Sequence, residues 1–171
     1  MKDVDLNDQI IDALRHYLDE QSRADNFSGS VLVARHGTSI FKFSSGFANR
    51  EKNILNGIDT KFNLGSANKM FTGVAIAQLA EAGSLGFHDA VGIYLPGFPN
   101  QAIREQVTIH HLLTHTSGLG SFIDLDCRDE FLAARENLKT IGDVVNLFKN
   151  RPLSHPIGEF HYSADGYEVL G

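Results

Sequence analysis

Ser66 and Lys69 are the residues of this sequence best suited to chemistry, three positions apart at the start of an apolar run. Residues three apart on a helix share a face, so a helix here brings the lysine ammonium beside the serine hydroxyl. A serine hydroxyl is a weak nucleophile until a neighbouring base takes its proton, and a desolvated lysine can be that base. The plainer alternative is a helix-capping serine followed by a lysine in solvent.

A second Ser-x-x-Lys pair, Ser39 and Lys42, shows that the spacing alone is a weak signal. It lies in an alternating polar and apolar run that is typical of a β-strand. Residues three apart on a strand point to opposite faces, so these two side chains cannot meet. Of the two pairs, only Ser66 and Lys69 therefore have a geometry in which the side chains can meet.

The elements that position this pair begin with a helix and a β-hairpin. Six apolar residues follow helical spacing towards a helix end near Glu20: Leu6, Ile10, Ala13, Leu14, Tyr17 and Leu18. Residues 30–34 and 39–43 are β-rich, and Gly37 between them supplies the turn. Residues 44–61 are polar and are predicted to be a connecting loop. Since two strands alone are marginal in water, we expect the hairpin to belong to a larger, mostly antiparallel sheet.

Helices are predicted for most of the remaining chain. Residues 67–82 are apolar around most of a helical circumference, which predicts a helix buried on nearly all sides. Gly83 is placed to end that helix. Residues 128–138 are expected to form a further helix.

Two more helices have recognisable starts. Thr108 is predicted to cap a short helix through His115, and Thr140, with Asp143 three residues on, to cap another. His111 and His115 would then lie four apart on one helix face, the spacing of two metal ligands. No third ligand is evident, so structural histidines and no metal are expected.

Composition sets limits on the class of protein. The chain has 171 residues, 42% hydrophobic and 21% charged, as expected for one globular domain. The net charge of −6, without a basic cluster, argues against nucleic acid as a partner. No apolar run approaches the ~20 residues of a membrane span.

The single Cys127 excludes an intrachain disulfide. The N-terminus lacks the apolar region of a signal peptide, so a cytoplasmic location is expected as written, and export in the native context stays open.

Three segments resemble the serine β-lactamase and penicillin-binding-protein family, in its class C branch with related esterases and D-amino-acid peptidases. Residues 64–69 look like the nucleophile motif, and residues 107–119 are very like the family's His-Leu-Leu-Thr-His-Thr-Ser-Gly-Leu segment. Residues 156–164 look like the Tyr-Ser-Asn motif with its Pro-x-Gly lead-in. The order of the segments also fits, and the likeness runs from about Ser28 to Gly171.

The resemblance implies roles for three catalytic residues. Ser66 would be the acylated nucleophile, with Lys69 as its proton partner. Tyr162 would be a second base and proton shuttle, although a partly buried core aromatic is the usual fate of a tyrosine. A phenol titrates near ~10 in water, so it needs an adjacent cation to act as a base. Lys69 would supply that cation, and the backbone N–H of Ser66 would be one oxyanion donor.

The chain departs from the family pattern in two places. Ala164 stands at the substrate-binding position where the family has asparagine, which favours an esterase-like activity over turnover of β-lactams or peptides. No Lys-Thr-Gly or His-x-Gly segment follows in residues 165–171. In the family such a segment lines the cleft and gives a second oxyanion donor, whose loss can cost ~10²–10³ in rate.

The predicted fold is therefore α/β (α+β), a β-lactamase/transpeptidase-like fold lacking its C-terminal strands. Residues 1–65 would be the N-terminal helix, hairpin and loop, and residues 66–171 the active-site helix and helical region of an incomplete catalytic domain. The predicted function is acyl-serine hydrolysis of a β-lactam, an ester or a D-amino-acid peptide, impaired in this chain, with no cofactor. The alternative is a non-catalytic fragment or pseudoenzyme. Such a non-catalytic chain would associate through its hairpin edge with another copy or a complementing chain.

Overall fold

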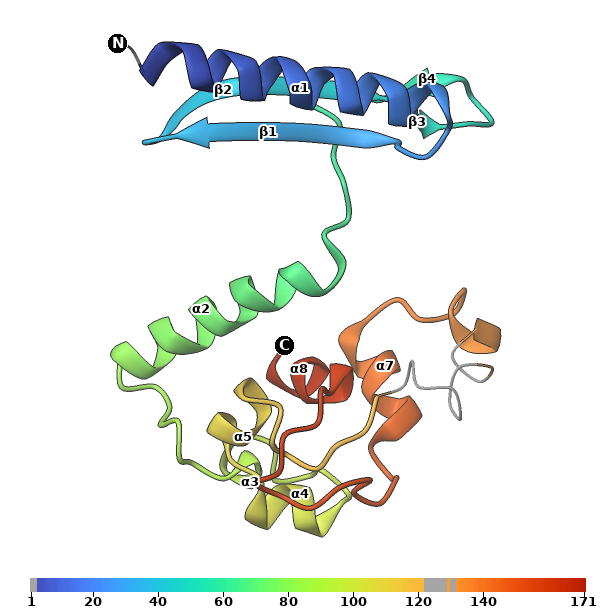
Figure 1. The fold of residues 1–171 in the computed structure, drawn as a ribbon. Coiled ribbons are helices and arrows are strands. Elements are labelled where there is room, and N and C mark those ends of the chain that lie inside the picture. The colour runs from blue at the N-terminus through green and yellow to red at the C-terminus, as the bar shows by residue number, and fades with distance from the viewer. Residues whose placement is uncertain (1–2, 122–128, 130–131) are drawn as a thin grey trace. The chain divides into compact units, whose positions relative to one another are not determined.

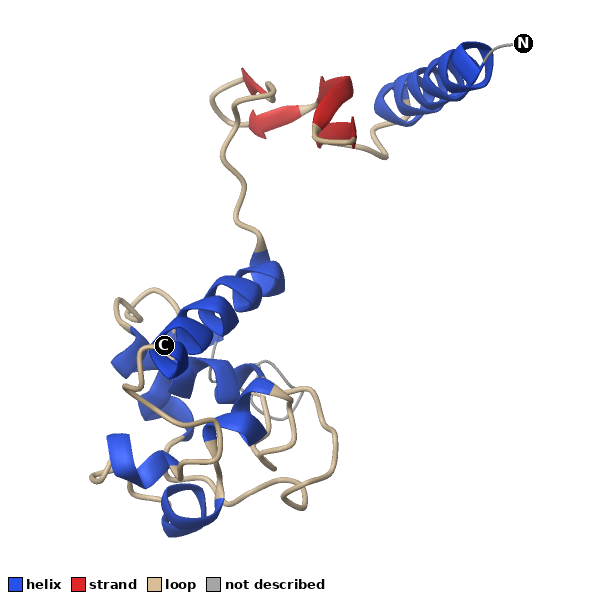
Figure 2. Ribbon diagram, turned by 90° about the vertical axis from the view of Figure 1, so that its left-hand side faces the viewer, coloured by secondary structure: helices blue, strands red, loops and turns tan. Residues whose placement is uncertain are grey.

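The computed structural model describes residues 3–121, 129 and 132–171. Cys127 and part of the helix predicted over 128–138 lie outside the described residues. The chain divides into two compact units, residues 1–63 and residues 64–171. The strands belong to the first unit and the second is helical, as Figures 1 and 2 show.

The N-terminal unit is a helix and an antiparallel hairpin. Helix α1 (Asp3–Arg23) precedes strands β1 (Gly29–Arg35) and β2 (Thr38–Ser45). His36 and Gly37 form the two-residue turn, with φ values of +50° and +79°. Positive φ at both turn residues matches the twist of the flanking strands, so the predicted hairpin is confirmed.

One face of the hairpin packs against α1. Val33 pairs with Phe41 across the strands, and Phe41 is buried, as is Leu18 on α1. The Arg15 guanidinium lies 5.0 Å from the centre of the Phe41 ring. These contacts tie the first helix to the sheet.

The loop predicted over residues 44–61 is wrong in part, because a second hairpin lies within it. Strands β3 (Phe47–Asn49) and β4 (Ile54–Leu55) pair antiparallel. The hydroxyl of Ser28 accepts from the backbone N–H of Phe47 at 3.2 Å and from the Asn56 amide at 3.1 Å. Because polar contacts hold this second hairpin, the sequence shows no alternating apolar pattern that would predict it. Each sheet in the described part of the chain has two strands, so the larger sheet is not formed by these residues.

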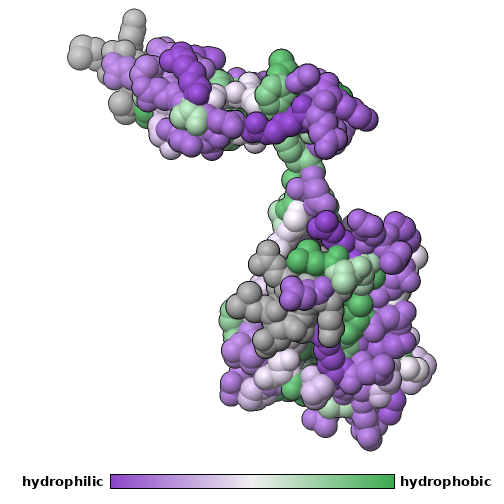
Figure 3. Space-filling model, turned by 90° about the vertical axis from the view of Figure 1, so that its right-hand side faces the viewer, coloured by the Kyte–Doolittle hydropathy of each residue, from purple (hydrophilic) through white to green (hydrophobic). Residues whose placement is uncertain are grey.

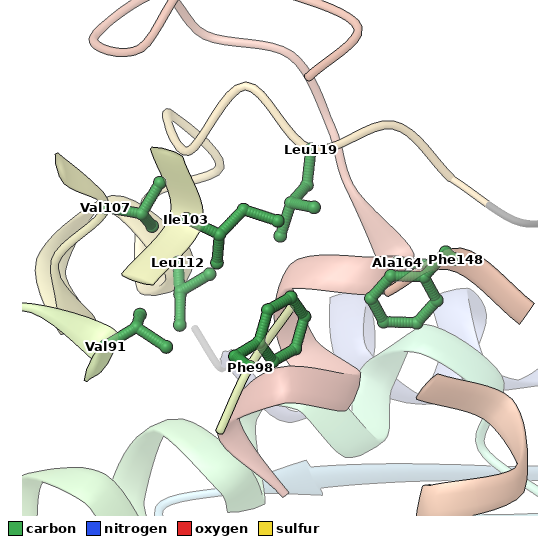
Figure 4. Packing of buried hydrophobic residues seen from close by; sticks show 8 residues of the cluster. All are labelled: Val91, Phe98, Ile103, Val107, Leu112, Leu119, Phe148 and Ala164. Atoms are coloured by element: carbon green, nitrogen blue, oxygen red, sulfur yellow. The ribbon is translucent and has the colours of Figure 1, made fainter. Parts of the chain in front are cut away.

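The C-terminal unit is built from short helices. The 3-10 helix η1 (Gly65–Asn68) runs into α2 (Lys69–Glu81). There follow α3 (Val91–Tyr94), α4 (Gln101–Gln106), α5 (Ile109–Leu113), α7 (Ile141–Phe148) and α8 (Ala164–Leu170). Buried apolar side chains from these helices and from the loops between them form the cluster shown in Figure 4: Val91, Phe98, Ile103, Val107, Leu112, Leu119, Phe148 and Ala164. None of the described helices has the length and apolarity needed to cross a membrane.

Helix α2 forms as predicted, but its predicted burial on nearly all sides is wrong. Ile76 is its one buried residue, whereas Met70 and Phe71 are about 60% exposed. The sequence shows which side chains of a helix are apolar enough to be buried, but it does not show which neighbouring elements are present to cover them. Within the C-terminal unit, α8 packs against one side of α2. Gly83, at φ +72°, follows the helix end as predicted.

The predicted helix caps are confirmed, but one helix is shorter than expected. Thr108 and His111 form a reciprocal capping box at the start of α5, and Thr140 and Asp143 form another at α7. Helix α5 ends at Leu113, and His115 has a left-handed φ of +58°. The two histidines therefore do not share a helix face, because the chain has left the helix before the second one.

Candidate active site

Ser66 and Lys69 meet at the start of the α2 helix. Gly65, at φ +54°, turns the chain into the 3-10 helix that carries Ser66, and Lys69 is the first residue of α2. This left-handed φ favours glycine because other residues suffer a steric clash of the Cβ atom. The Lys69 ammonium donates to Ser66 Oγ at 3.5 Å. The predicted pairing of these two side chains is present.

Tyr162 reaches the same hydroxyl from the loop just before α8. Its phenol oxygen lies 2.7 Å from Ser66 Oγ, although the two residues are 96 positions apart in the chain. Lys69 Nζ lies 5.3 Å from the centre of the Tyr162 ring. The structure thus brings together all three side chains that the sequence selected.

The surroundings of Tyr162 favour its ionised form. The hydrogen bond with Ser66 lowers the pKa of the phenol most, and hydrogen bonding and charge from Lys69 lower it further. Burial raises the pKa of the phenol but does not reverse the lowering, since Tyr162 is 45% exposed. A phenol with a lowered pKa beside a serine hydroxyl is suited to accept its proton.

Backbone and side-chain bonds hold the Tyr162 loop on both sides of the tyrosine. The backbone N–H of His161 donates to the His115 carbonyl at 2.9 Å, and that of Ser163 donates to His115 Nδ1 at 3.1 Å. The buried Ser163 hydroxyl donates to the Gly120 carbonyl at 2.6 Å and caps α8 by accepting from Gly166 N–H at 3.0 Å. The loop is therefore anchored to the segment that follows α5.

Two aromatic side chains near the site were not predicted from the sequence. The His115 ring lies 4.6 Å from the Tyr162 ring and 5.2 Å from the Tyr167 ring, measured between centres. Lys69 Nζ lies 5.6 Å from the centre of the Tyr167 ring, whose hydroxyl donates to the Leu113 carbonyl at 3.1 Å. In the sequence, His115 stands out only through the 107–119 segment and through its spacing from His111, neither of which predicts a contact with Tyr162, and no pattern points to Tyr167.

Ala164, the predicted substrate-binding position, is a packing position in this chain. It is the first residue of α8, is 6% exposed and belongs to the hydrophobic cluster. A buried methyl group offers a substrate neither a donor nor an acceptor. A substrate-binding role of this position therefore stays a prediction, and Ala164 supplies no amide there.

The exposure of Ser66 and the types of residue around it determine which chemistry this site can perform. Ser66 is exposed and so can meet a dissolved acyl compound. In the part of the chain that the structure describes, no three His, Cys, Asp or Glu residues are grouped to hold a metal ion. The chemistry available here is that of a hydroxyl, an amine and a phenol.

Comparison with known proteins places the chain in a family. The sequence profile of the Beta-lactamase family matches residues 8–171. PbpX of Bacillus subtilis (strain 168), which carries a penicillin-binding-protein name, is 36% identical over 170 residues, 99% of this chain and 38% of PbpX.

Solved structures agree with the sequence match. A penicillin binding protein from Bacillus halodurans superposes with a TM-score of 0.73 at 36% identity, over 91% of this chain and 47% of that protein. EstCE1, a hydrolase with promiscuous acyltransferase activity, gives 0.71 at 28% identity, over 94% and 44%. These neighbours confirm the predicted fold class.

The chain spans less than half the length of these relatives. The match nevertheless covers nearly all of the chain itself, both units included. The chain belongs to the serine β-lactamase and penicillin-binding-protein family.

Proposed function

We propose that this protein is an acyl-serine hydrolase that works through an acyl-enzyme on Ser66. One observation carries the proposal: Ser66 Oγ lies 2.7 Å from the Tyr162 phenol and 3.5 Å from the Lys69 ammonium. The hydroxyl thus has a proton acceptor and a cation within reach, which is what an activated serine needs.

The chemical steps follow from these contacts. Ser66 Oγ attacks the acyl carbon and its proton passes to the Tyr162 phenolate, whose charge Lys69 offsets. The tetrahedral intermediate collapses, the bond to the leaving group breaks, and the leaving group takes that proton from Tyr162. A water molecule then attacks the acyl-serine, gives its proton to Tyr162 and releases the acid, and the proton returns to Ser66 Oγ. The Ser66 backbone N–H would be one donor to the oxyanion.

The substrate classes proposed are esters, β-lactams and D-amino-acid peptides. Esters are favoured because Ala164 has no amide to hold the amide of a substrate. A short-chain nitrophenyl ester should therefore be hydrolysed faster than a chromogenic cephalosporin. Faster turnover of the cephalosporin would reverse this order.

The direct test is covalent labelling of Ser66. Intact and peptide mass spectrometry after exposure to a fluorophosphonate should find one adduct, on Ser66, and Ser66→Ala should abolish it. Ser39→Ala is the matched control, since Ser39 also precedes a lysine by three residues but lies in strand β2, and it should label fully. A folded wild-type chain without a Ser66 adduct would remove the proposal.

A further inference from the structure

His115 holds the segment carrying Tyr162 at two points. Its carbonyl accepts from the N–H of His161, and its ring Nδ1 accepts from the N–H of Ser163 at 3.1 Å. These are the residues immediately before and after Tyr162. One histidine therefore fixes the backbone on both sides of the phenol.

The backbone of His115 is itself in a demanding conformation. Its φ of +58° is uncommon for a residue other than glycine, with histidine, asparagine and aspartate among those that adopt it more readily. The bond from Ser163 depends on the direction in which this turn sends the ring. A strained residue placed against reactive groups is a reason to look for a function.

The hydrogen bond from Ser163 also fixes the state of the imidazole. A ring nitrogen that accepts an N–H cannot carry a proton, so His115 is neutral with its hydrogen on Nε2. Burial lowers the pKa of His115 most and the charge of Lys69 lowers it further, and a backbone contribution from Ser163 opposes them in part. The net lowering favours the neutral imidazole, as does the N–H that Ser163 donates to Nδ1.

The ring then supports the phenol from one side. It lies 4.6 Å from the Tyr162 ring at an interplanar angle of 35°, while Ser66 contacts the hydroxyl end of the same tyrosine. The titratable groups facing His115 are Lys69 from α2, Tyr162 from the loop and Tyr167 from α8.

We propose that neutral His115 is a positioning residue that holds the Tyr162 phenol against Ser66. The effect of His115 on the reaction rate rests on the proposed function, whereas its effect on the position of the Tyr162 phenol does not. Protonation of His115 would turn Nδ1 into a donor facing another donor, break the bond to Ser163 and release the phenol. The site should therefore lose activity as the pH falls through the lowered pKa of His115.

Two variants separate the contributions of the hydrogen bond and the ring. His115→Asn keeps an oxygen acceptor near the place of Nδ1 and tolerates the left-handed backbone, but loses the ring. His115→Phe keeps a ring but has no acceptor. We expect fluorophosphonate labelling of Ser66 to slow by about 10²-fold in the Phe variant and by less than about 10-fold in the Asn variant, since small misplacements of a catalytic group cost this much.

The pH profile distinguishes positioning from a general structural role. In wild type, labelling should fall on acidification with a limb that His115→Asn lacks, because asparagine does not titrate. The limb due to Tyr162 should remain in both proteins. Labelling of His115→Phe within about twofold of wild type, or an unchanged acid limb in His115→Asn, would overturn the inference.

Two spectroscopic readouts need no enzymatic activity. Nitrogen-15 NMR of histidine-labelled wild type should show unprotonated Nδ1 and protonated Nε2 for His115 near neutral pH, assigned by the signal missing from His115→Asn. Absorbance titration should show the pKa of Tyr162 returning towards that of an ordinary phenol in His115→Phe, with Tyr162→Phe as reference.

If wild type does not label, the proposed function fails, while these two readouts still test the role of His115. If His115→Phe does not fold, the NMR result decides, and a protonated Nδ1 contradicts the inference.

Discussion

Tyr162 contacts each of the other side chains that make up the site. Its hydroxyl contacts Ser66, its ring contacts His115, and Lys69 lies over its face. Each of the contacts with Ser66 and Lys69 lowers the pKa of the phenol, and modest burial does not cancel them. Removal of the hydroxyl alone therefore separates proton transfer from packing.

We predict that Tyr162→Phe reduces Ser66 acylation by about 10²–10⁴-fold, the usual contribution of a positioned acid or base. The ring contacts with His115 and Lys69 should persist, so far-UV circular dichroism and thermal unfolding should change little. Stopped-flow labelling at a series of pH values measures the effect. A variant that reacts as fast as wild type would exclude Tyr162 as the proton acceptor.

The lowered pKa of Tyr162 also predicts a sign for stability. The folded chain favours the phenolate, so the associated stabilisation is fully present above the ordinary phenol pKa near ~10 and is lost as the pH falls through the lowered value. Wild type should therefore gain stability relative to Tyr162→Phe as the pH rises through this window. Urea unfolding at pH 7 and pH 10 would test it, and an unchanged difference would contradict it.

At the scale of elements, caps and core packing hold the helices that carry the site. Helix α7 begins with a reciprocal box in which the Asp143 carboxylate accepts from the N–H groups of Lys139 and Thr140. These bonds lower the pKa of Asp143, with the Lys139 bond the largest cause. The neighbouring α8 carries Tyr167 and begins at Ala164, two residues after Tyr162. Stability at α7 is thus linked to the site through the packing of α7 against α8.

We predict that Thr140→Ala lowers the free energy of unfolding by about 1 kcal/mol, because the N–H of Asp143 loses its side-chain acceptor. Thr140→Ser keeps the hydroxyl and should stay close to wild type. Urea titration followed by circular dichroism measures both. Equal stability of the alanine and serine variants would show that the cap does not stabilise α7.

We predict a larger loss from the core of the C-terminal unit. Ile103 is fully buried, so Ile103→Ala should cost about 2–5 kcal/mol through lost burial and the cavity left behind. Ile93 is 64% exposed and makes the matched control, for which Ile93→Ala should change stability by less than about 0.5 kcal/mol. Similar losses at both positions would contradict the assigned core.

At the scale of the whole molecule, both units carry exposed apolar side chains. Leu32 on β1 is 64% exposed, and Met70 and Phe71 on α2 about 60%. Figure 3 shows hydrophobic areas lying among hydrophilic ones on the surface of the molecule. Exposed apolar area and strand edges favour association with another chain.

We therefore predict that the chain self-associates in a concentration-dependent way. A charge on the hairpin should oppose pairing there, so Leu32→Lys should lower the sedimentation coefficient at high concentration. Met70→Lys serves as the comparison on α2. A monodisperse, folded wild-type monomer across the concentration range would exclude association and weaken the non-catalytic alternative.

Patterns within a few residues determine much of this protein by themselves. The hairpin turn at Gly37, the caps at Thr108 and Thr140, and the pairing of Ser66 with Lys69 all depend on neighbours within four positions. Tyr162 is identified from the sequence as well, but through a family motif rather than through local physics.

Tertiary structure alone decided the rest. The exposed face of α2, the burial of Ala164 and the contacts of His115 with the Tyr162 segment depend on which distant segments pack together. Sequence periodicity indicates which side chains could be buried, but not which distant segment packs against them. The 2.7 Å contact between Ser66 and Tyr162 joins residues 96 positions apart, and only the packing of the helical unit closes that distance.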